Sequence, residues 1–402
     1  MKTFDYSFSQ IWFALALVLT TATQLRWGGL PIGPGELMLV VWLIATGLQI
    51  IKQRRITLSL PLKLFIAFWS VVLILLFAGW LVGLFQGVFD VRAGTHNLLA
   101  YLFVCLITLT AITYWNSEQA ITIGKLVLFF VVLALIPLWI YGQFFNEIGS
   151  LNIWYGGSRF LGWAVDPNQT AILTVPLPFM ALYYYRQSSK FKHKMLCIVL
   201  LFGSIILGIG TDSDSLKVAW VGAIVVYFIL TLLARGQLTH LKVVIALAII
   251  LLICSIGLFV FGAKIYASVE QMYYLGNQGP VRLALWANGI QATSNSPLVG
   301  FGPGAYSGVQ EPFSGSECHN TFIDWMTNTG VAGFLILFFL LTFIFIKAIT
   351  SSNNQEVVAV LTTLIIVSLF LYVIRHPVWW FYLLWVISLI SFRKEKRNRT
   401  YF

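Results

Sequence analysis

Long apolar runs alternate with short polar segments along almost the whole chain. Most of the runs approach the length of about 20 residues that a helix needs to cross a lipid bilayer. Because they lack the strict alternation of barrel strands, they favour helices. The pattern predicts twelve membrane-spanning helices, at residues 9–24, 33–51, 61–86, 97–115, 119–142, 167–185, 195–210, 215–234, 241–262, 320–347, 356–374 and 377–392.

Composition supports this interpretation. Of the 402 residues, 59% are hydrophobic and only 10% are charged, and the mean hydropathy is +0.87. An ordinary soluble domain carries about 25% charged residues. We therefore expect an all-α integral membrane protein, with residues 1–402 forming a single polytopic domain. The longest connection, residues 263–319, lies between helices nine and ten and would form a large loop subdomain.

The distribution of positive charge predicts the orientation in the membrane. With the N-terminus in the cytoplasm, the twelve helices place 18 of the 25 Lys and Arg residues on the cytoplasmic side, as the positive-inside rule requires. Both termini are then cytoplasmic. The net charge of +11 reflects these loops and the tail Arg393–Arg399, which fits contact with lipid headgroups better than a nucleic-acid site. The seven remaining cations lie outside: Arg26, Arg92, Arg159, Lys217, Lys264, Arg282 and Arg375.

A first polar segment, residues 155–168, precedes the sixth predicted helix. Asp166 can cap exposed amides of that helix, and Pro167 suits its first turn. Arg159 is either a single interfacial arginine or a cation presented to an anionic group. The segment alone does not separate these two interpretations.

A second segment, residues 279–290, reads as a helix within the large loop. Arg282, Trp286 and Gly289 follow at the spacing of one helix face. One interpretation is an amphipathic helix on the membrane surface with a snorkelling arginine. The other is a guanidinium held beside an aromatic ring for a ligand. The following glycine-rich residues 296–304 are not a nucleotide-binding loop, because the lysine of that motif is missing.

The third segment leads from the large loop into the tenth predicted helix. His319 and Asn320 lie at this polar–apolar boundary, and Asp324 lies about one turn deeper, where a carboxylate is costly. A histidine here can titrate near neutral pH and act as a base, or it can simply bond to the loop.

Two further groups of polar residues open on the same side. Lys217 follows Asp214 by three residues, so the two could form a helix ion pair. Arg375 and His376 join the last two helices and could be interfacial anchors beside the aromatic pair Trp379–Trp380. The scattered histidines and cysteines predict no metal site and no cofactor, so any chemistry would rest on arginines and a histidine.

Together the three segments resemble the O-antigen ligase and O-antigen polymerase superfamily of bacterial inner membranes. The resemblance rests on the order of three motifs: Arg159-x-x-Gly162 with Asp166-Pro167-Asn168; Arg282-x-x-x-Trp286 with Pro297-Leu-Val-Gly300-Phe-Gly302; and His319-Asn320 with Gly330. The layout of twelve helices, with a large loop between helices nine and ten, agrees with that family.

The resemblance implies a membrane glycosyltransferase of the inner (plasma) membrane with a periplasmic active site. The donor would be a glycan on undecaprenyl diphosphate, the acceptor a glycan or lipid A-core, and the surroundings membrane lipids. Arg282 would hold the diphosphate and His319 would bind or activate the acceptor; Trp286 and Asn320 would contact substrate. The family often has an arginine where this chain has Asp214, so Lys217, Arg159 or Arg375 would supply the second phosphate contact.

Three functions stay open at this stage. A polymerase extends repeat units on the lipid carrier, and a ligase transfers the finished chain to lipid A-core; we favour the polymerase slightly. A transporter or flippase of lipid-linked oligosaccharide is the alternative. It is disfavoured because the chain shows no obvious internal repeat and its charges gather at the outer mouth rather than at the bilayer midplane.

Overall fold

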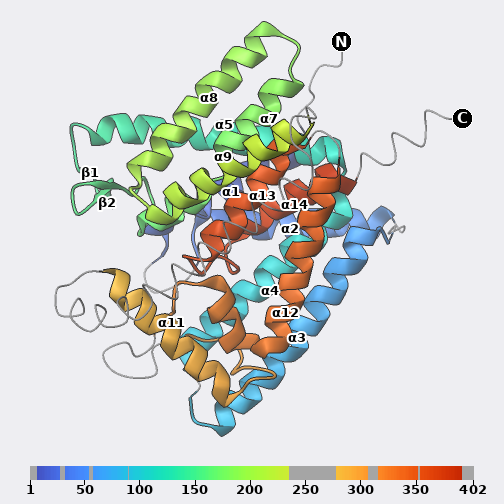
Figure 1. Cartoon of the computed structure of the whole chain (residues 1–402). Coiled ribbons are helices and arrows are strands. Elements are labelled where there is room, and N and C mark those ends of the chain that lie inside the picture. The colour runs from blue at the N-terminus through green and yellow to red at the C-terminus, as the bar shows by residue number, and fades with distance from the viewer. Residues whose placement is uncertain are drawn as a thin grey trace, which may run out of the picture.

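The fold is almost entirely helical in the computed structural model, which describes residues 7–27, 32–53, 58–88, 90–234, 278–306, 316–351 and 354–391 (Figure 1). The helices are α1 (Phe8–Leu19), α2 (Pro34–Gln53), α3 (Leu60–Phe85), α4 (Val91–Tyr114), α5 (Ser117–Gly142), α6 (Pro167–Thr174), α7 (Leu177–Gln187), α8 (Phe191–Gly210), α9 (Asp214–Ala234), α11 (Gln278–Asn295), α12 (Thr321–Thr350), α13 (Gln355–Ser368) and α14 (Pro377–Ser391). A short 3₁₀ helix, Thr23–Leu25, follows α1.

Seven helices in the described part of the chain are long and apolar enough to cross a membrane: α2, α3, α4, α5, α8, α9 and α12. Three apolar helices, α1, α13 and α14, are shorter. The protein is therefore an all-α membrane protein in outline, as predicted. The total of twelve spans stays a prediction, because residues 241–262 and much of the loop 263–319 lie outside the described residues.

Several predicted helices differ in detail from the structure: α1 ends five residues earlier, at Leu19, and α4 begins six residues earlier, at Val91. Residues 167–185 form two helices instead of one, because α6 ends at Thr174 and α7 begins at Leu177, just after Pro176. Proline lacks an amide hydrogen and its ring interferes with the preceding turn, so a break at this position is expected. The predicted helix 356–374 is also shorter, since α13 ends at Ser368.

Polar caps begin several helices where the sequence changes from polar to apolar. Asp90 accepts hydrogen bonds from the first amides of α4, and Asn116 forms a reciprocal capping box at α5. Asp166 accepts a bond from the Asn168 amide at 2.8 Å at the start of α6, so the predicted cap is confirmed. Such side chains satisfy amides that have no partner within the helix.

The centre of the molecule is built around α14, which packs against α4, α5 and α13. The large side chains at positions 379–382 and 385 of this helix are fully buried. Trp379 and Trp380, predicted to lie beside interfacial anchors, are therefore core residues: both are 0% exposed and pack edge to face on one another. Their indole groups donate to the backbone oxygens of Leu364 and Ile374.

Two small antiparallel hairpins lie between α5 and α6. Strands β1 (Glu147–Ile148) and β2 (Leu151–Asn152) form the first, and β3 (Trp154–Tyr155) and β4 (Arg159–Phe160) form the second. Hydropathy alone did not predict them, because each strand has only two residues. The tight turn of the second hairpin uses Gly156 and Gly157, both with positive φ.

Candidate functional site

Helix α11 packs against α12 (Figure 1). One side chain of α11 is hydrogen-bonded to the segment that precedes α12. The indole Nε1 of Trp286 donates a hydrogen bond of 3.0 Å to the backbone oxygen of Cys318. Arg282 lies one turn before Trp286 on the same helix face, and His319 directly follows Cys318. This bond therefore brings the second and third sequence motifs together.

His319 lies in a tight turn that Asp324 fixes from within α12. The Asp324 carboxylate accepts hydrogen bonds from the amide of Cys318 at 3.0 Å and from the amide of Asn320 at 3.4 Å. Asp324 is only 2% exposed. Between these two amides, His319 has a φ of +55°, which is uncommon for a side chain of this kind. A strained residue held by its surroundings often marks a functional site.

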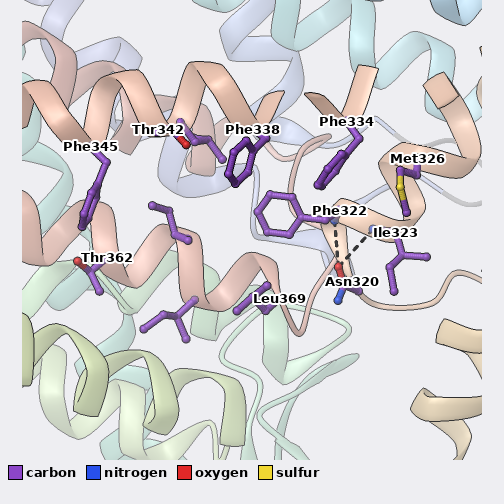
Figure 2. Close-up of a pocket in the computed structure, with 13 residues that line it drawn as sticks. Asn320, Phe322, Ile323, Met326, Phe334, Phe338, Thr342, Phe345, Thr362 and Leu369 are labelled. Atoms are coloured by element: carbon purple, nitrogen blue, oxygen red, sulfur yellow. Dashed lines mark hydrogen bonds between the residues drawn. The ribbon is translucent and has the colours of Figure 1, made fainter. Parts of the chain in front are cut away.

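Asn320 caps α12 and so has a structural contact already in place. Its Oδ1 accepts hydrogen bonds from the amides of Phe322 at 3.0 Å and Ile323 at 3.3 Å (Figure 2). The side chain of Asn320, predicted to contact substrate, thus uses its oxygen to begin the helix. The cap keeps His319 at the first turn of α12, where amides without intrahelical partners favour negative charge.

The electrostatic surroundings of His319 favour its neutral form. Loss of hydration lowers the pKa of His319, even though part of its side chain is exposed. The Glu317 carboxylate raises this pKa, and the Arg282 guanidinium lowers it further. Asp166, in the first motif, also acts on His319 and raises its pKa. All three sequence motifs thus contribute a charged or titratable group to the field around this imidazole. A neutral imidazole can accept a proton near neutral pH.

Arg375 forms a two-pronged ion pair with Glu317, two residues before His319. One terminal nitrogen bonds to Glu317 Oε1 and the other lies 3.0 Å from Oε2, and the side chains are 24% and 15% exposed. The same guanidinium donates to Asn97 Oδ1 at 3.0 Å and lies 5.3 Å from the centre of the Tyr372 ring. Arg375 therefore holds the segment before His319 in place through Glu317, and it is not a free anchor at the membrane surface.

The glycine-rich residues 297–304 bind to a break in α12. The backbone of Gly330 has φ +68° and ψ −177°, which interrupts the helix and leaves the oxygens of Thr327 and Asn328 without helical donors. The amides of Phe301 and Gly302 donate to these two oxygens at 2.8 and 3.0 Å. The Pro–Leu–Val–Gly–Phe–Gly motif is thus a structural brace for α12.

Asn97 of α4 connects the glycine-rich residues 297–304 to the ion pair between Arg375 and Glu317. The Gly304 amide donates to Asn328 Oδ1 at 2.8 Å, and Asn97 Nδ2 donates to the Gly304 oxygen at 2.9 Å. Asn97 also accepts from Arg375, as described above. Sequence analysis assigned no role to Glu317 or Asn97. The signal that could have singled out Asn97 is its position in an apolar helix, because a polar group there is costly and needs a partner.

Arg159 lies on β4 and points to a second cluster. Its Nε donates to the backbone oxygen of Thr211 at 3.2 Å, and its charge acts on Asp212. In the adjoining turn, Ser213 donates to Asn168 Oδ1 at 3.0 Å, which joins α9 to the start of α6. The terminal nitrogens of Arg159 have no bonding partner among the residues that the structure describes.

Lys217 is bound by two carboxylates in the same cluster. Its Nζ lies 2.5 Å from Asp212 and 3.3 Å from Asp214, which confirms the predicted ion pair and adds a second partner. The hydrogen bond from Lys217 lowers the pKa of Asp212. These groups are largely exposed, so the pairs contribute little stability. Lys217 is a weaker candidate than Arg159 for binding phosphate, because Asp212 and Asp214 already occupy its ammonium group and would compete with an anionic ligand.

The structure thus forms two clusters. Arg282, Trp286 and His319 belong to the first, with Arg375 joined through Glu317, and Arg159 and Lys217 belong to the second around residues 211–214. Asp166 connects the two clusters. It directly precedes α6, to which Ser213 of the second cluster is bonded, and its charge raises the pKa of His319 in the first cluster. Among the residues described, no three His, Cys, Asp or Glu side chains come together in a way that could hold a metal ion.

Comparison with known proteins bears on this arrangement. No curated protein matches the chain. The family model of the O-antigen ligases matches residues 196–338, a range that includes α11, the His319 turn and the break in α12. This match supports the resemblance to the O-antigen ligases and polymerases over the part of the chain that holds the second and third motifs.

Proposed function

We propose that the protein transfers a glycan from undecaprenyl diphosphate to a sugar hydroxyl at the periplasmic face of the inner membrane. The match of residues 196–338 to the O-antigen ligase family model supports the general class, a membrane glycosyltransferase of the ligase or polymerase type. The observation that supports the proposed site is the bond from Trp286 to Cys318, which holds Arg282 beside His319. It joins a cation suited to a leaving diphosphate to a base suited to an acceptor.

In the proposed reaction, the acceptor hydroxyl attacks the anomeric carbon of the donor glycan. His319 Nδ1 or Nε2 accepts the hydroxyl proton, the new glycosidic bond forms, and the bond between that carbon and the diphosphate oxygen breaks. Undecaprenyl diphosphate leaves with the bonding electrons, and the anomeric configuration is inverted. Neutral imidazole suits this role, and the lowered pKa of His319 keeps it neutral at physiological pH.

Arg282 would neutralise the leaving diphosphate. A guanidinium can donate two parallel hydrogen bonds to phosphate oxygens, and such contacts stabilise charge that develops in the transition state. This chemistry requires no metal ion, so we propose transfer without a metal or other cofactor.

Arg159 is the better candidate for a second phosphate contact. Arg375 and Lys217 are each bound by carboxylates, whereas within the described residues Arg159 bonds only through its Nε, to the Thr211 oxygen. Arg159 also lies at the turn that ends at Asp214, where the family often has its arginine. A guanidinium that reaches this turn from β4 could replace, in space, the charge that the sequence lacks there.

The test is incubation of the purified protein with lipid-linked repeat units, followed by gel analysis of glycan length. A polymerase, which we favour, gives a ladder of lengths; a ligase gives a product only when lipid A-core is added. His319→Ala should abolish transfer, and His193→Ala is the matched control, since His193 is exposed on α8. Full transfer by His319→Ala would refute the proposed base. Movement of labelled lipid across proteoliposomes with no new glycan bond would favour the flippase alternative.

A further inference from the structure

Asn97 is a buried residue near the start of α4, and both polar atoms of its side chain reach distant parts of the chain. It is only 1% exposed. Its Nδ2 donates to the Gly304 oxygen at 2.9 Å, and its Oδ1 accepts from Arg375 Nη1 at 3.0 Å. These partners are 207 and 278 positions away in the sequence. The side chain therefore joins three segments that only the fold brings together.

The two partners of Asn97 require opposite ends of its amide group. A guanidinium has only donors, so Arg375 needs the oxygen, whereas the Gly304 carbonyl only accepts, so it needs the nitrogen. Aspartate would place a carboxylate against the Gly304 oxygen, and leucine would satisfy neither partner. Asparagine is therefore matched to this position by chemistry as well as by size.

Asn97 belongs to a closed circuit of contacts. The Gly304 amide donates to Asn328 Oδ1 at 2.8 Å, and Asn328 Nδ2 lies 3.4 Å from the Tyr372 hydroxyl. The Tyr372 ring in turn lies 5.3 Å from the Arg375 guanidinium. Each of the five residues thus contacts two others of the set. A polar network with its bonds satisfied holds its members in one arrangement.

Asn97 and Glu317 share one nitrogen of Arg375. Nη1 donates both to Asn97 Oδ1 and to Glu317 Oε1, while Nη2 donates to Glu317 Oε2 at 3.0 Å. Because Asn97 takes part of Nη1, it limits how fully the guanidinium neutralises the Glu317 carboxylate. A change at Asn97 should therefore alter the charge balance within the ion pair.

This ion pair belongs to the charged groups that act on His319 from four segments. Burial lowers the pKa of His319 most. Among the charges, Glu317 has the largest effect and raises this pKa, Arg282 of α11 lowers it, Asp166 before α6 raises it, and Arg375 before α14 lowers it. The balance between Glu317 and Arg375 thus reaches the imidazole.

We infer that Asn97 is a positioning residue for His319: it holds Arg375 against Glu317 and so fixes the charge beside the imidazole. The inference rests on the proposed function only where it treats His319 as the base. The contacts that carry it involve no substrate.

Two substitutions of Asn97 should act on His319 in opposite directions. Asn97→Asp gives Nη1 a charged acceptor that competes with Glu317, so Glu317 keeps more of its charge and the pKa of His319 should rise, by about 0.5 pH unit. Asn97→Leu leaves Nη1 to Glu317 alone, so the pKa should fall, by about 0.3 pH unit. Shifts of the same sign would overturn the inference, as would no shift in either variant.

Chemical modification measures the pKa of His319 without any transfer. The full chain in detergent is treated with diethyl pyrocarbonate, which reacts with neutral imidazole, between about pH 5 and pH 8. Peptide mass spectrometry then gives the rate at His319, which is exposed. His193, exposed on α8, is the internal reference, and its curve should be the same in every variant.

Thr108→Val is the matched control for loss of a buried polar contact in α4. Thr108 is 0% exposed, accepts from Trp69 Nε1 at 2.9 Å and donates to the Cys105 oxygen at 2.9 Å. This variant should lose stability, as the Asn97 variants do, but leave the His319 curve unchanged. A shift equal to that of an Asn97 variant would reduce Asn97 to a general packing role and overturn the inference.

The Glu317→Gln background separates positioning from a direct effect of charge. If Asn97 acts through Glu317, neither Asn97→Asp nor Asn97→Leu should move the His319 curve measurably in that background. A shift that persists there would overturn the inference. If Asn97→Asp does not fold, the sign of the Asn97→Leu shift and its loss in the Glu317→Gln background decide the question.

The pH–rate profile of transfer connects this result with the proposed function. Its acid limb should move in the same direction as the His319 modification curve in each Asn97 variant. If the curve moves while the acid limb stays fixed, the proposed base fails and the positioning of His319 by Asn97 stands. If the wild-type protein transfers no glycan, the proposed function fails, and the modification curves alone decide the role of Asn97.

Discussion

Replacement of Trp286 by Phe tests the contact on which the proposed site depends. The substitution keeps an aromatic ring on α11 but removes the indole donor to the Cys318 oxygen, a bond of 3.0 Å. A hydrogen bond of this kind contributes about 0.5–1.5 kcal/mol net. If that energy holds Arg282 and His319 in their reactive arrangement, kcat/KM should fall by about two- to tenfold.

The assay is initial-rate glycan transfer by purified protein, paired with thermal unfolding in the same detergent. Trp220→Phe is the matched control, because its indole donates to the Val175 oxygen at 2.8 Å, a bond of the same type at the end of α6. Both variants should lose similar stability, but only Trp286→Phe should lose transfer. Equal kcat/KM for Trp286→Phe and the wild-type protein would refute the argument that this bond positions the site.

Four further outcomes follow from the same geometry. Arg282→Lys keeps the charge but not the planar fork, so it should cost about 2–4 kcal/mol of transition-state stabilisation in kcat/KM with unchanged unfolding temperature; near-normal transfer would show that a point charge suffices. Glu317→Gln removes a carboxylate that raises the pKa of His319. Protonation of His319 inactivates the base, so the acid limb of the pH–rate profile should move to lower pH. A move to higher pH would contradict this expectation. Transfer should survive EDTA and not respond to Mg²⁺ or Mn²⁺, and activity lost to the chelator and restored by either ion would show a metal requirement. Gly330→Ala should lower the unfolding temperature, since strain at positive φ costs about 1–3 kcal/mol and the new Cβ would lie 2.2 Å from Leu298; an unchanged temperature would mean that the brace adjusts freely.

Features set by neighbouring residues could be predicted from the sequence. Hydropathy located the helices of the described chain, and Asp166 capped α6 as its position before Pro167 indicated. The pairing of Lys217 with Asp214 was also local, three residues apart on one helix. The order of the motifs was enough to point to the family whose model matches residues 196–338.

Long-range partners could not be predicted in this way. Glu317 and Arg375 are 58 residues apart, and Asn97 is 278 residues from Arg375, so no local spacing relates them. The same limit applies to the glycine motif. The amides of Phe301 and Gly302 complete a helix that begins about 20 residues later, at Thr321.

The broken helix α12 affects how family members could be recombined. Its backbone oxygens at Thr327 and Asn328 are buried and depend on amides donated by residues 301–302. Without those amides, two peptide acceptors would be left unsatisfied inside a membrane protein, where each costs several kcal/mol. The glycine motif is therefore inseparable from the helix that it completes. A chimaera that exchanges the large loop to alter acceptor choice should keep residues 297–304 together with α12 from one parent and join the foreign segment before Pro297.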